Sequence, residues 1–361
     1  MLKKKKKDTI VGLEFDSGSI AAAEVPPSPG GPVAHVGVQQ VAAGAVRDGE
    51  IIDADAVAAA LAELFDRNEL SKHVRLGIAN QHVAFRTLRL PPIDDPKQLN
   101  NAVRFMAQEQ IPMALDSAVL DHQVIGATVS EEGNRQVDVA VVAARKEMVA
   151  TLLEPVRRAG LDPVGIDLTA FGMIRALAGA SAAPSISPQT GPAPETFVQT
   201  TLYCSLGDVT NLAIAKGRSC LFTRVSPVGL EGIAESLSGS TGLGREHARL
   251  WLSHVGLAQP VEAIEGAPET IALARAAMEN GASSLLDELR LSLDFYGTQE
   301  AAAAVERIVL CGPGSAVPGL STRMEPALGL PISTGRPEAL ADLDQASAAR
   351  LTLSYGLALD D

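Results

Sequence analysis

The chain carries the same strand-rich pattern twice. A short apolar strand, a tight turn and a returning strand begin near Ile10, and a similar succession of strand, glycine turn, strand, turn and strand begins near Thr201. Internal duplication of this kind predicts two similar halves, and two halves that face each other form a cleft. The pattern constrains the fold more than length does, because 361 residues suggest only two or three domains of ordinary size.

The composition is that of a folded, acidic protein. Hydrophobic residues make up 46% and charged residues 20%, which excludes global disorder. Aromatic residues make up only 3%, and removing the five lysines at residues 3–7 from a net charge of −13 leaves −18. An acidic body poor in aromatic residues argues against nucleic-acid binding. It leaves a pocket for a single nucleotide possible, because local backbone dipoles can outweigh net charge.

The chain lacks the sequence motifs of several functional classes. Cys204, Cys220 and Cys311 form no CxxC pair and are expected to be reduced and buried. The six histidines form no metal-binding motif, and no GxSxG nucleophile elbow is present. We find neither an apolar run long enough to cross a membrane nor a secretory signal peptide, so a cytoplasmic location is expected.

Hydrophobic periodicity predicts alternating strands and helices, which is typical of the α/β class. In the first half, we predict helices at residues 54–65, 99–110, 146–159 and 171–178, and strands at 9–15, 20–25, 33–41, 74–79, 83–90, 119–129, 136–144 and 163–168. In the second half, we predict strands at 197–205, 210–215, 219–227, 308–311 and 331–332, and helices at 230–237, 245–255, 268–278, 284–295, 322–328 and 347–359. The proline-rich stretch at 181–196 is expected to be a linker.

Three glycine turns follow buried strands and are candidates for phosphate binding. Backbone N–H groups in such turns can surround phosphate oxygens, because glycine lets the chain approach closely. A single turn of this kind is more often an ordinary hairpin or corner, whereas three in this order are more specific. The candidate cofactor-binding residues are Asp16, Ser17, Gly18 and Ser19 in the first turn, Gly207, Asp208 and Thr210 in the second, and Gly312, Gly314 and Ser315 in the third.

With their flanking strands, these turns resemble the actin-like ATPase superfamily, which has two phosphate loops and an adenosine loop. The opening IVGLEFDSGSI at residues 10–20 is similar to the type IV pilus assembly protein PilM family within that superfamily. Further similar segments are residues 85–92, 102–112, 206–212, 221–224, 310–315, 318–320 and 355–359. The resemblance covers nearly the whole chain except the linker.

The resemblance implies an actin-like, ribonuclease H-like duplicated fold with two lobes around a nucleotide cleft and a small inserted α/β subdomain. The expected parts are a disordered basic tail (1–7), the first lobe (8–84 and 161–180), the inserted subdomain (85–160), the linker (181–196), the second lobe (197–335) and a C-terminal helix that returns to the first lobe (336–361). It also implies similarity to the division protein FtsA, with ATP and Mg²⁺ as possible cofactors.

The resemblance further implies a cytoplasmic component of an inner-membrane platform. The implied partner is the N-terminal cytoplasmic tail of a PilN-like membrane protein, together with other platform and motor components. We expect the tail to dock in the groove between the first lobe and the inserted subdomain, a region that contains Arg86, Arg89 and Arg104. Membrane association would then be peripheral and through partners. The lysines at residues 3–7 could also contact anionic lipid.

The chain departs from the pattern of actin-like ATPases at five positions around the expected pocket. Glu14 stands where an Asp usually helps to hold Mg²⁺, which makes it the only candidate catalytic residue and metal ligand, and Ser205 replaces the second such Asp. The other departures are Ala21 for Lys, Leu252 for Lys in a flanking helix, and Pro313 for Gly. Asp16 and Asp208 could compensate for the lost carboxylate, although both fit the role of turn-capping residues.

Three hypotheses follow. The first is a scaffold that docks a partner's tail and has a degenerate ATP pocket. The second is an active ATPase that drives conformational change in the pilus machine. The third is a sugar-kinase-like enzyme on the same fold, for which we find no catalytic Asp. Glu14 and Ser205 favour weak or absent hydrolysis, whereas Gly18 and Gly207 keep nucleotide binding possible.

Overall fold

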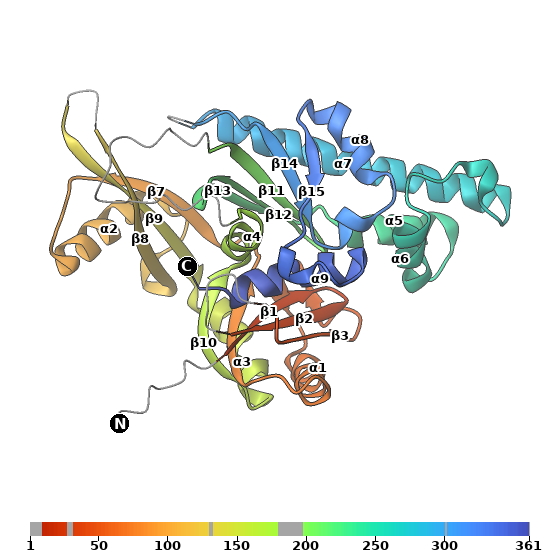
Figure 1. The fold of residues 1–361 in the computed structure, drawn as a ribbon, viewed down its shortest axis with the longest axis horizontal. Coiled ribbons are helices and arrows are strands. Elements are labelled where there is room, and N and C mark those ends of the chain that lie inside the picture. Colours follow the sequence, from red (N-terminus) through yellow and green to blue (C-terminus); the bar gives the residue numbers. More distant parts are fainter. Residues whose placement is uncertain (1–8, 27–31, 130–132, 180–197, 300–301, 361) are drawn as a thin grey trace.

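The computed structural model describes residues 9–26, 32–129, 133–179, 198–299 and 302–360 (Figure 1). The expected basic tail and proline-rich linker lie outside the described residues. The two lobes lie one above the other in the view of Figure 1, and the smaller subdomain projects to the left.

Two five-stranded sheets with the same topology form the lobes. The first has the order β10-β6-β1-β2-β3 and the second β15-β14-β11-β12-β13. In each sheet the first three strands along the chain pair antiparallel, and the last two are added in parallel beside the first strand. The shared order confirms the predicted duplication. The first sheet consists of β1 (Ile10–Asp16), β2 (Ser19–Val25), β3 (His35–Gln40), β6 (His73–Ile78) and β10 (Asp162–Leu168). The second consists of β11 (Thr200–Leu206), β12 (Thr210–Lys216), β13 (Ser219–Ser226), β14 (Arg307–Cys311) and β15 (Ile332–Thr334).

Helices cover both faces of the first sheet. On one face α1 (Ala54–Arg67) and α3 (Lys146–Arg158) share a core with β1. On the other face lie α4 (Thr169–Leu177) and the last helix, α9 (Gln345–Ala358), which packs against β1 and β2. Although α3 falls within the residues expected for the inserted subdomain, its Leu152 and Val156 are buried in the first-lobe core.

From Leu351 to Ala358 the helix α9 is buried on all sides, because glycines let other backbone segments approach it closely. A β-carbon at Gly12 of β1 would lie 2.0 Å from the carbonyl oxygen of Ser354, and one at Gly356 would lie 1.9 Å from that of Gly172 in α4. Arg350 is the only charged residue of α9, and its side chain emerges where the two lobes meet.

The inserted subdomain is a three-stranded sheet with one helix. Its order is β7-β9-β8, and α2 (Pro96–Gln110) packs Val103 and Ala107 against it. The strands are β7 (Ala84–Leu90), β8 (Ala118–Val129) and β9 (Arg135–Arg145). The strand β8 forms one edge of this sheet, as β10 does in the first lobe.

The second lobe contains the helices α5 (Leu230–Thr241), α6 (Arg245–His254), α7 (Pro268–Gly297) and α8 (Leu320–Leu328). Two of them, α7 and α8, contact its sheet, whereas α5 and α6 pack against α7 at the right of Figure 1. The two helices predicted at residues 268–278 and 284–295 are one continuous helix, α7. The prediction left residues 279–283 between the two helices, but Gly281 in that interval closely approaches Ile233 of α5, so packing keeps the helix intact across it.

Candidate functional site

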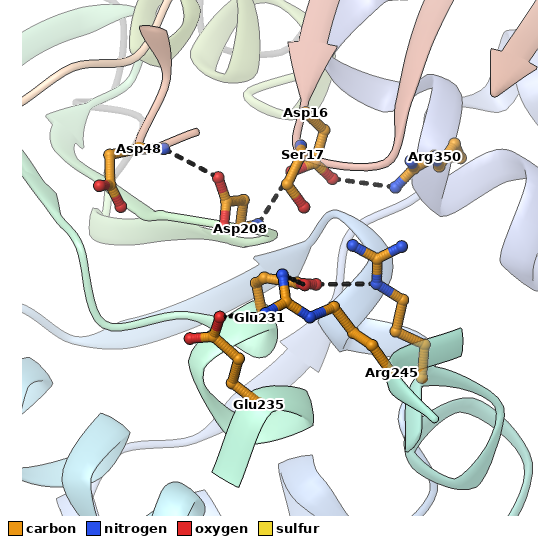
Figure 2. Close-up of polar contacts among 9 residues, drawn as sticks. Asp16, Ser17, Asp48, Asp208, Glu231, Glu235, Arg245 and Arg350 are labelled. Carbon is orange, nitrogen blue, oxygen red and sulfur yellow. Dashed lines mark hydrogen bonds and ion pairs between the residues drawn. The ribbon is translucent and has the colours of Figure 1, made fainter. Parts of the chain in front are cut away.

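The first two glycine turns meet at the interface between the lobes. Asp16 ends β1, and Asp208 lies in the turn between β11 and β12. The backbone N–H of Asp208 donates to Oδ1 of Asp16 at 2.9 Å, and the N–H of Ser17 donates to the same oxygen at 2.9 Å. Figure 2 shows the backbone N–H of Asp208 directed at Asp16, while the carboxylate of Asp208 points towards Asp48. The carboxylate of Asp16 therefore caps its own turn, as predicted, and also joins the two lobes.

A short hairpin makes a second bond between the lobes. The strands β4 (Val46–Arg47) and β5 (Glu50–Ile51) are joined by Asp48 and Gly49, both with positive φ (51° and 73°). The N–H of Asp48 donates to Oδ2 of Asp208 at 3.0 Å (Figure 2), while the carbonyl of Asp48 accepts from Nδ2 of buried Asn80 at 3.0 Å. The sequence analysis missed this hairpin, although Asp-Gly is a strong signal for a two-residue turn.

Arginines surround the contact between Asp16 and Asp208. Arg350 of α9 pairs with Oδ2 of Asp16 at 3.0 Å. On the second-lobe side, Arg249 of α6 pairs with Glu231 at 2.8 Å, and its guanidinium lies beside Gly18, where a β-carbon would be 3.5 Å from Nη1. Arg245 also pairs with Glu231. Cations from both lobes thus lie next to the first turn, and Figure 2 shows Arg350 beside Asp16.

A cavity of about 350 Å³ lies beside this contact, between the lobes and α3. Its polar lining includes Glu14, Asp16, Thr169, Ser205, Asp208 and Asn211. Among the described residues Glu14 has no hydrogen-bond or ion-pair partner, and burial raises the pKa of its carboxyl to about 8, with a further rise from the charge of Asp16. Burial and the nearby charge of Asp16 also raise the pKa of Asp208 to about 6.

Asn211 is the most unusual polar group of the cavity. Residue Asn211 is 3% exposed, and neither its Oδ1 nor its Nδ2 has a hydrogen-bond partner among the described residues. It pairs in register with Ser205 across β11 and β12, so both side chains belong to the same part of the lining. Burying an amide without a hydrogen bond lowers the stability of the protein, so this cavity is suited to a polar ligand that would bond to Asn211.

The structure brings together only some of the predicted binding residues. Asp16, Gly207 and Asp208 line the cavity with Glu14, and Ser17 and Gly18 continue the first turn beside it. The remaining five serve the packing of the lobes. Thr210 is fully buried and donates to the carbonyl of Val228 at 2.6 Å, and Ser19 is buried in β2.

The third turn packs against β11 instead of lining the cavity. Gly312 has φ of 71°, and Ser315 donates its hydroxyl to the carbonyl of Gly312 at 2.8 Å. A β-carbon at Gly314 would lie 2.4 Å from Cβ of Leu206. In this structure the glycines at this turn serve close packing.

Neutral Glu14 makes stability depend on pH. The carboxyl stays protonated in the folded protein up to about pH 8 but ionises near 4.5 when unfolded. The folded state therefore binds more protons over that interval, and rising pH favours unfolding by up to about 1.4 kcal/mol per pH unit. We expect Glu14→Gln to remove this slope between pH 6 and 8, above the pKa of about 6 of Asp208, measured by urea denaturation. Exposed Glu109→Gln serves as the control, and parallel curves for wild type and Glu14→Gln would show that Glu14 is ionised.

A second, larger groove of about 780 Å³ lies between the first lobe and the inserted subdomain. Its floor includes Phe85 of β7 and Phe171 of α4, whose rings meet edge to face with centroids 6.0 Å apart. The edge strands β8 and β10 both contribute to its walls. The three arginines named from the sequence, Arg86, Arg89 and Arg104, are not among the residues that line it.

The fold defines the class of protein. Two solved structures that share it are the ethanolamine utilization protein EutJ from Carboxydothermus hydrogenoformans (TM-score 0.54, 13% identity, covering 98% of this chain and 89% of that one) and MreB5 of Spiroplasma citri bound to AMPPNP (TM-score 0.55, 13% identity, covering 97% and 95%). The fold is actin-like, as the sequence predicted.

The family follows from the sequence. The profile of type IV pilus assembly protein PilM matches residues 12–358, so the chain belongs to that family. A solved structure described as a PilM–PilN type IV pilus biogenesis complex is similar with a TM-score of 0.79 and 25% identity, covering 97% of both chains. The family resemblance read from the motifs is confirmed.

The described residues contain neither a membrane-spanning helix nor a cluster of metal ligands. No helix within them is long and apolar enough to cross a membrane. Nor do they contain a group of three or more His, Cys, Asp or Glu side chains placed to bind a metal ion.

Proposed function

We propose that this protein is an adaptor of a type IV pilus or related secretion platform, which docks the N-terminal cytoplasmic tail of a PilN-like inner-membrane protein. Membership of the PilM family and the similarity to a PilM–PilN complex support this proposal. The observation that carries it is the groove between the first lobe and the inserted subdomain, which combines apolar walls with two sheet edges.

The groove has the features that an extended peptide requires. The strands β8 and β10 each end a sheet, and an edge strand presents N–H and C=O groups that an added strand can pair with. Val124 of β8 is 48% exposed and lines the groove together with Val119 and Ile125. Asp121, Arg218 and the ion pair of Arg175 with Asp167 supply charge near these apolar positions. Apolar tail residues would bury there, while the tail's backbone pairs with a sheet edge.

The proposed adaptor has a degenerate nucleotide cleft. Mg²⁺ prefers ionised carboxylate ligands. Ser205 is not a carboxylate, and the carboxylate of Asp16 is engaged by Arg350 and two N–H groups. These residues do not fit a Mg²⁺–nucleotide complex, which favours a scaffold over an ATPase.

The alternative is an active ATPase that drives conformational change in the pilus machine. The retained turns at Gly18 and Gly207 favour it, as does the actin-like fold that this chain shares with a nucleotide-bound MreB5. Calorimetric titration with ATP, with and without Mg²⁺, separates the two functions. A scaffold predicts no Mg²⁺-dependent binding, whereas tight Mg²⁺-dependent binding followed by hydrolysis would establish the ATPase.

The proposed location is the cytoplasmic face of the inner membrane, reached through the partner tail and other platform and motor components. The direct test is calorimetric titration with a synthetic peptide of the PilN-like protein's N-terminal cytoplasmic residues. We expect saturable one-to-one binding. Absence of binding at millimolar peptide would refute tail docking.

A further inference from the structure

We infer that the carboxylate of Asp16 fills the anion-binding site formed by the two glycine turns. There it links the two lobes and prevents phosphate from binding. The inference deepens the degenerate-cleft part of the proposed function and rests on it. On this inference, the side chain of Asp16 is what prevents a nucleotide from binding in the cleft.

The donors around Asp16 are those that an oxyanion would use. Oδ1 accepts from the N–H groups of Ser17, in the first turn, and Asp208, in the second, each at 2.9 Å. Oδ2 accepts from Arg350 at 3.0 Å. Two backbone N–H groups at glycine turns together with a guanidinium make an anion site, and here a carboxylate fixed to the chain fills it.

The carboxylate also closes the approach to the second turn. A β-carbon at Gly207 would lie 3.3 Å from Oδ2 of Asp16, so the glycine leaves just enough room for the carboxylate of the opposite lobe. A phosphate oxygen bound to the N–H of Asp208 would have to stand where Oδ1 stands. Entry of phosphate therefore requires Asp16 to leave, which breaks a bond between the lobes.

The surroundings support a site built for an anion from both sides. Arg249 of the second lobe lies beside Gly18, and Arg350 reaches the same turn from α9. Asn211, which is buried and has no hydrogen-bond partner in the described part of the chain, lines the adjoining cavity. If the carboxylate were removed, the cations, the N–H groups and the amide would remain.

A second hydrogen bond between the lobes does not involve Asp16. The N–H of Asp48 donates to Oδ2 of Asp208 at 3.0 Å, from a hairpin of the first lobe. Removing the Asp16 carboxylate should therefore loosen the lobes without separating them. This makes an Asp16 variant a suitable test, because the fold does not depend on that bond alone.

The test is calorimetric titration of Asp16→Gly with pyrophosphate and with ATP. We expect at least a tenfold gain in affinity over wild type for both probes, since both carry the phosphate oxygens that the donors recognise. Asp16→Ser, which keeps a short side chain, should gain in the same direction and replaces the glycine variant if that one folds poorly. Equal affinity of wild type and both variants would overturn the inference, as would tight binding by wild type.

Two control variants separate the mechanism from a change in net charge. Asp48→Asn removes one negative charge from the same cluster but keeps its N–H bond to Asp208, so we expect no gain. A gain equal to that of Asp16→Gly would overturn the inference in favour of simple repulsion. In Asp16→Gly with Arg350→Gln, the gain should fall at least tenfold because the cation is lost.

Failure of this inference is distinguishable from failure of the proposed function. Tail binding is measured separately, at a groove that does not include Asp16 or Asp208. If the variants gain no phosphate affinity but the tail binds, only the inference that Asp16 fills the anion site is refuted. If the variants gain phosphate affinity but the tail does not bind, the docking function is refuted and the inference about Asp16 is supported.

Discussion

Gly356→Ala should destabilise the protein by about 3 kcal/mol, the largest effect we expect from adding one methyl group. The new β-carbon would lie 1.9 Å from the carbonyl oxygen of Gly172 and 2.5 Å from its carbon. Both atoms are backbone, so α4 and α9 must move apart to admit it. Because α9 also packs against β1 and β2, the displacement would reach the sheet that carries Glu14 and Asp16. Urea denaturation measures the change.

A matched control exists on another helix. Gly239 lies in α5, is exposed, and has no atom within 4 Å of an added β-carbon. Gly239→Ala should therefore be neutral or stabilising by up to about 1 kcal/mol, because alanine has the higher helix propensity. Similar stabilities for the two variants would contradict the close crossing of α4 and α9.

Val124→Arg should reduce affinity for the PilN-like tail at least tenfold, about 1.4 kcal/mol. The side chain lines the groove from β8 and is 48% exposed, so the substitution leaves the protein core intact. A guanidinium at this position would occupy space meant for the tail and place a charge against its apolar residues. Calorimetric titration with the tail peptide measures the loss.

Val129→Arg is the matched control for this substitution. Val129 lies on the same strand, is 66% exposed, and is not part of the groove lining. We expect its affinity for the tail to stay within twofold of wild type. Equal losses in both variants would point to an electrostatic effect of added charge and would argue against docking in the groove.

Local patterns predicted most of the fold. The strand–turn–strand pattern that begins near Ile10 and Thr201 predicted two lobes, and the sheets repeat one strand order. The short apolar run that contains Val11 and Leu13 predicted a strand, and the sheet that it joins is covered by helices on both faces. The continuity of α7 could not be predicted in this way, since its packing against α5 offsets the cost of the glycine at position 281.

The site was harder to predict because its contacts join distant residues. Glu14, Asp16, Gly207 and Asp208 were named from the sequence, and the structure places all four at one cavity. The bond between Asp16 and the N–H of Asp208 spans 192 positions, and the hairpin at Asp48 reaches Asp208 over 160. No local pattern reports such distances. Asn211 was also missed, because a single amide in a strand has no signature until its burial is known.

Hydrogen–deuterium exchange with and without the tail peptide tests tail docking in the groove most directly. Docking there predicts slower exchange at residues 118–125 of β8 and 165–171 of β10 and α4, which contribute to the groove walls and floor. Exchange of the exposed face of α7 should not change. Protection confined to the lobe interface around Asp16 and Asp208, or to α7, with none in the groove, would contradict the proposed docking site.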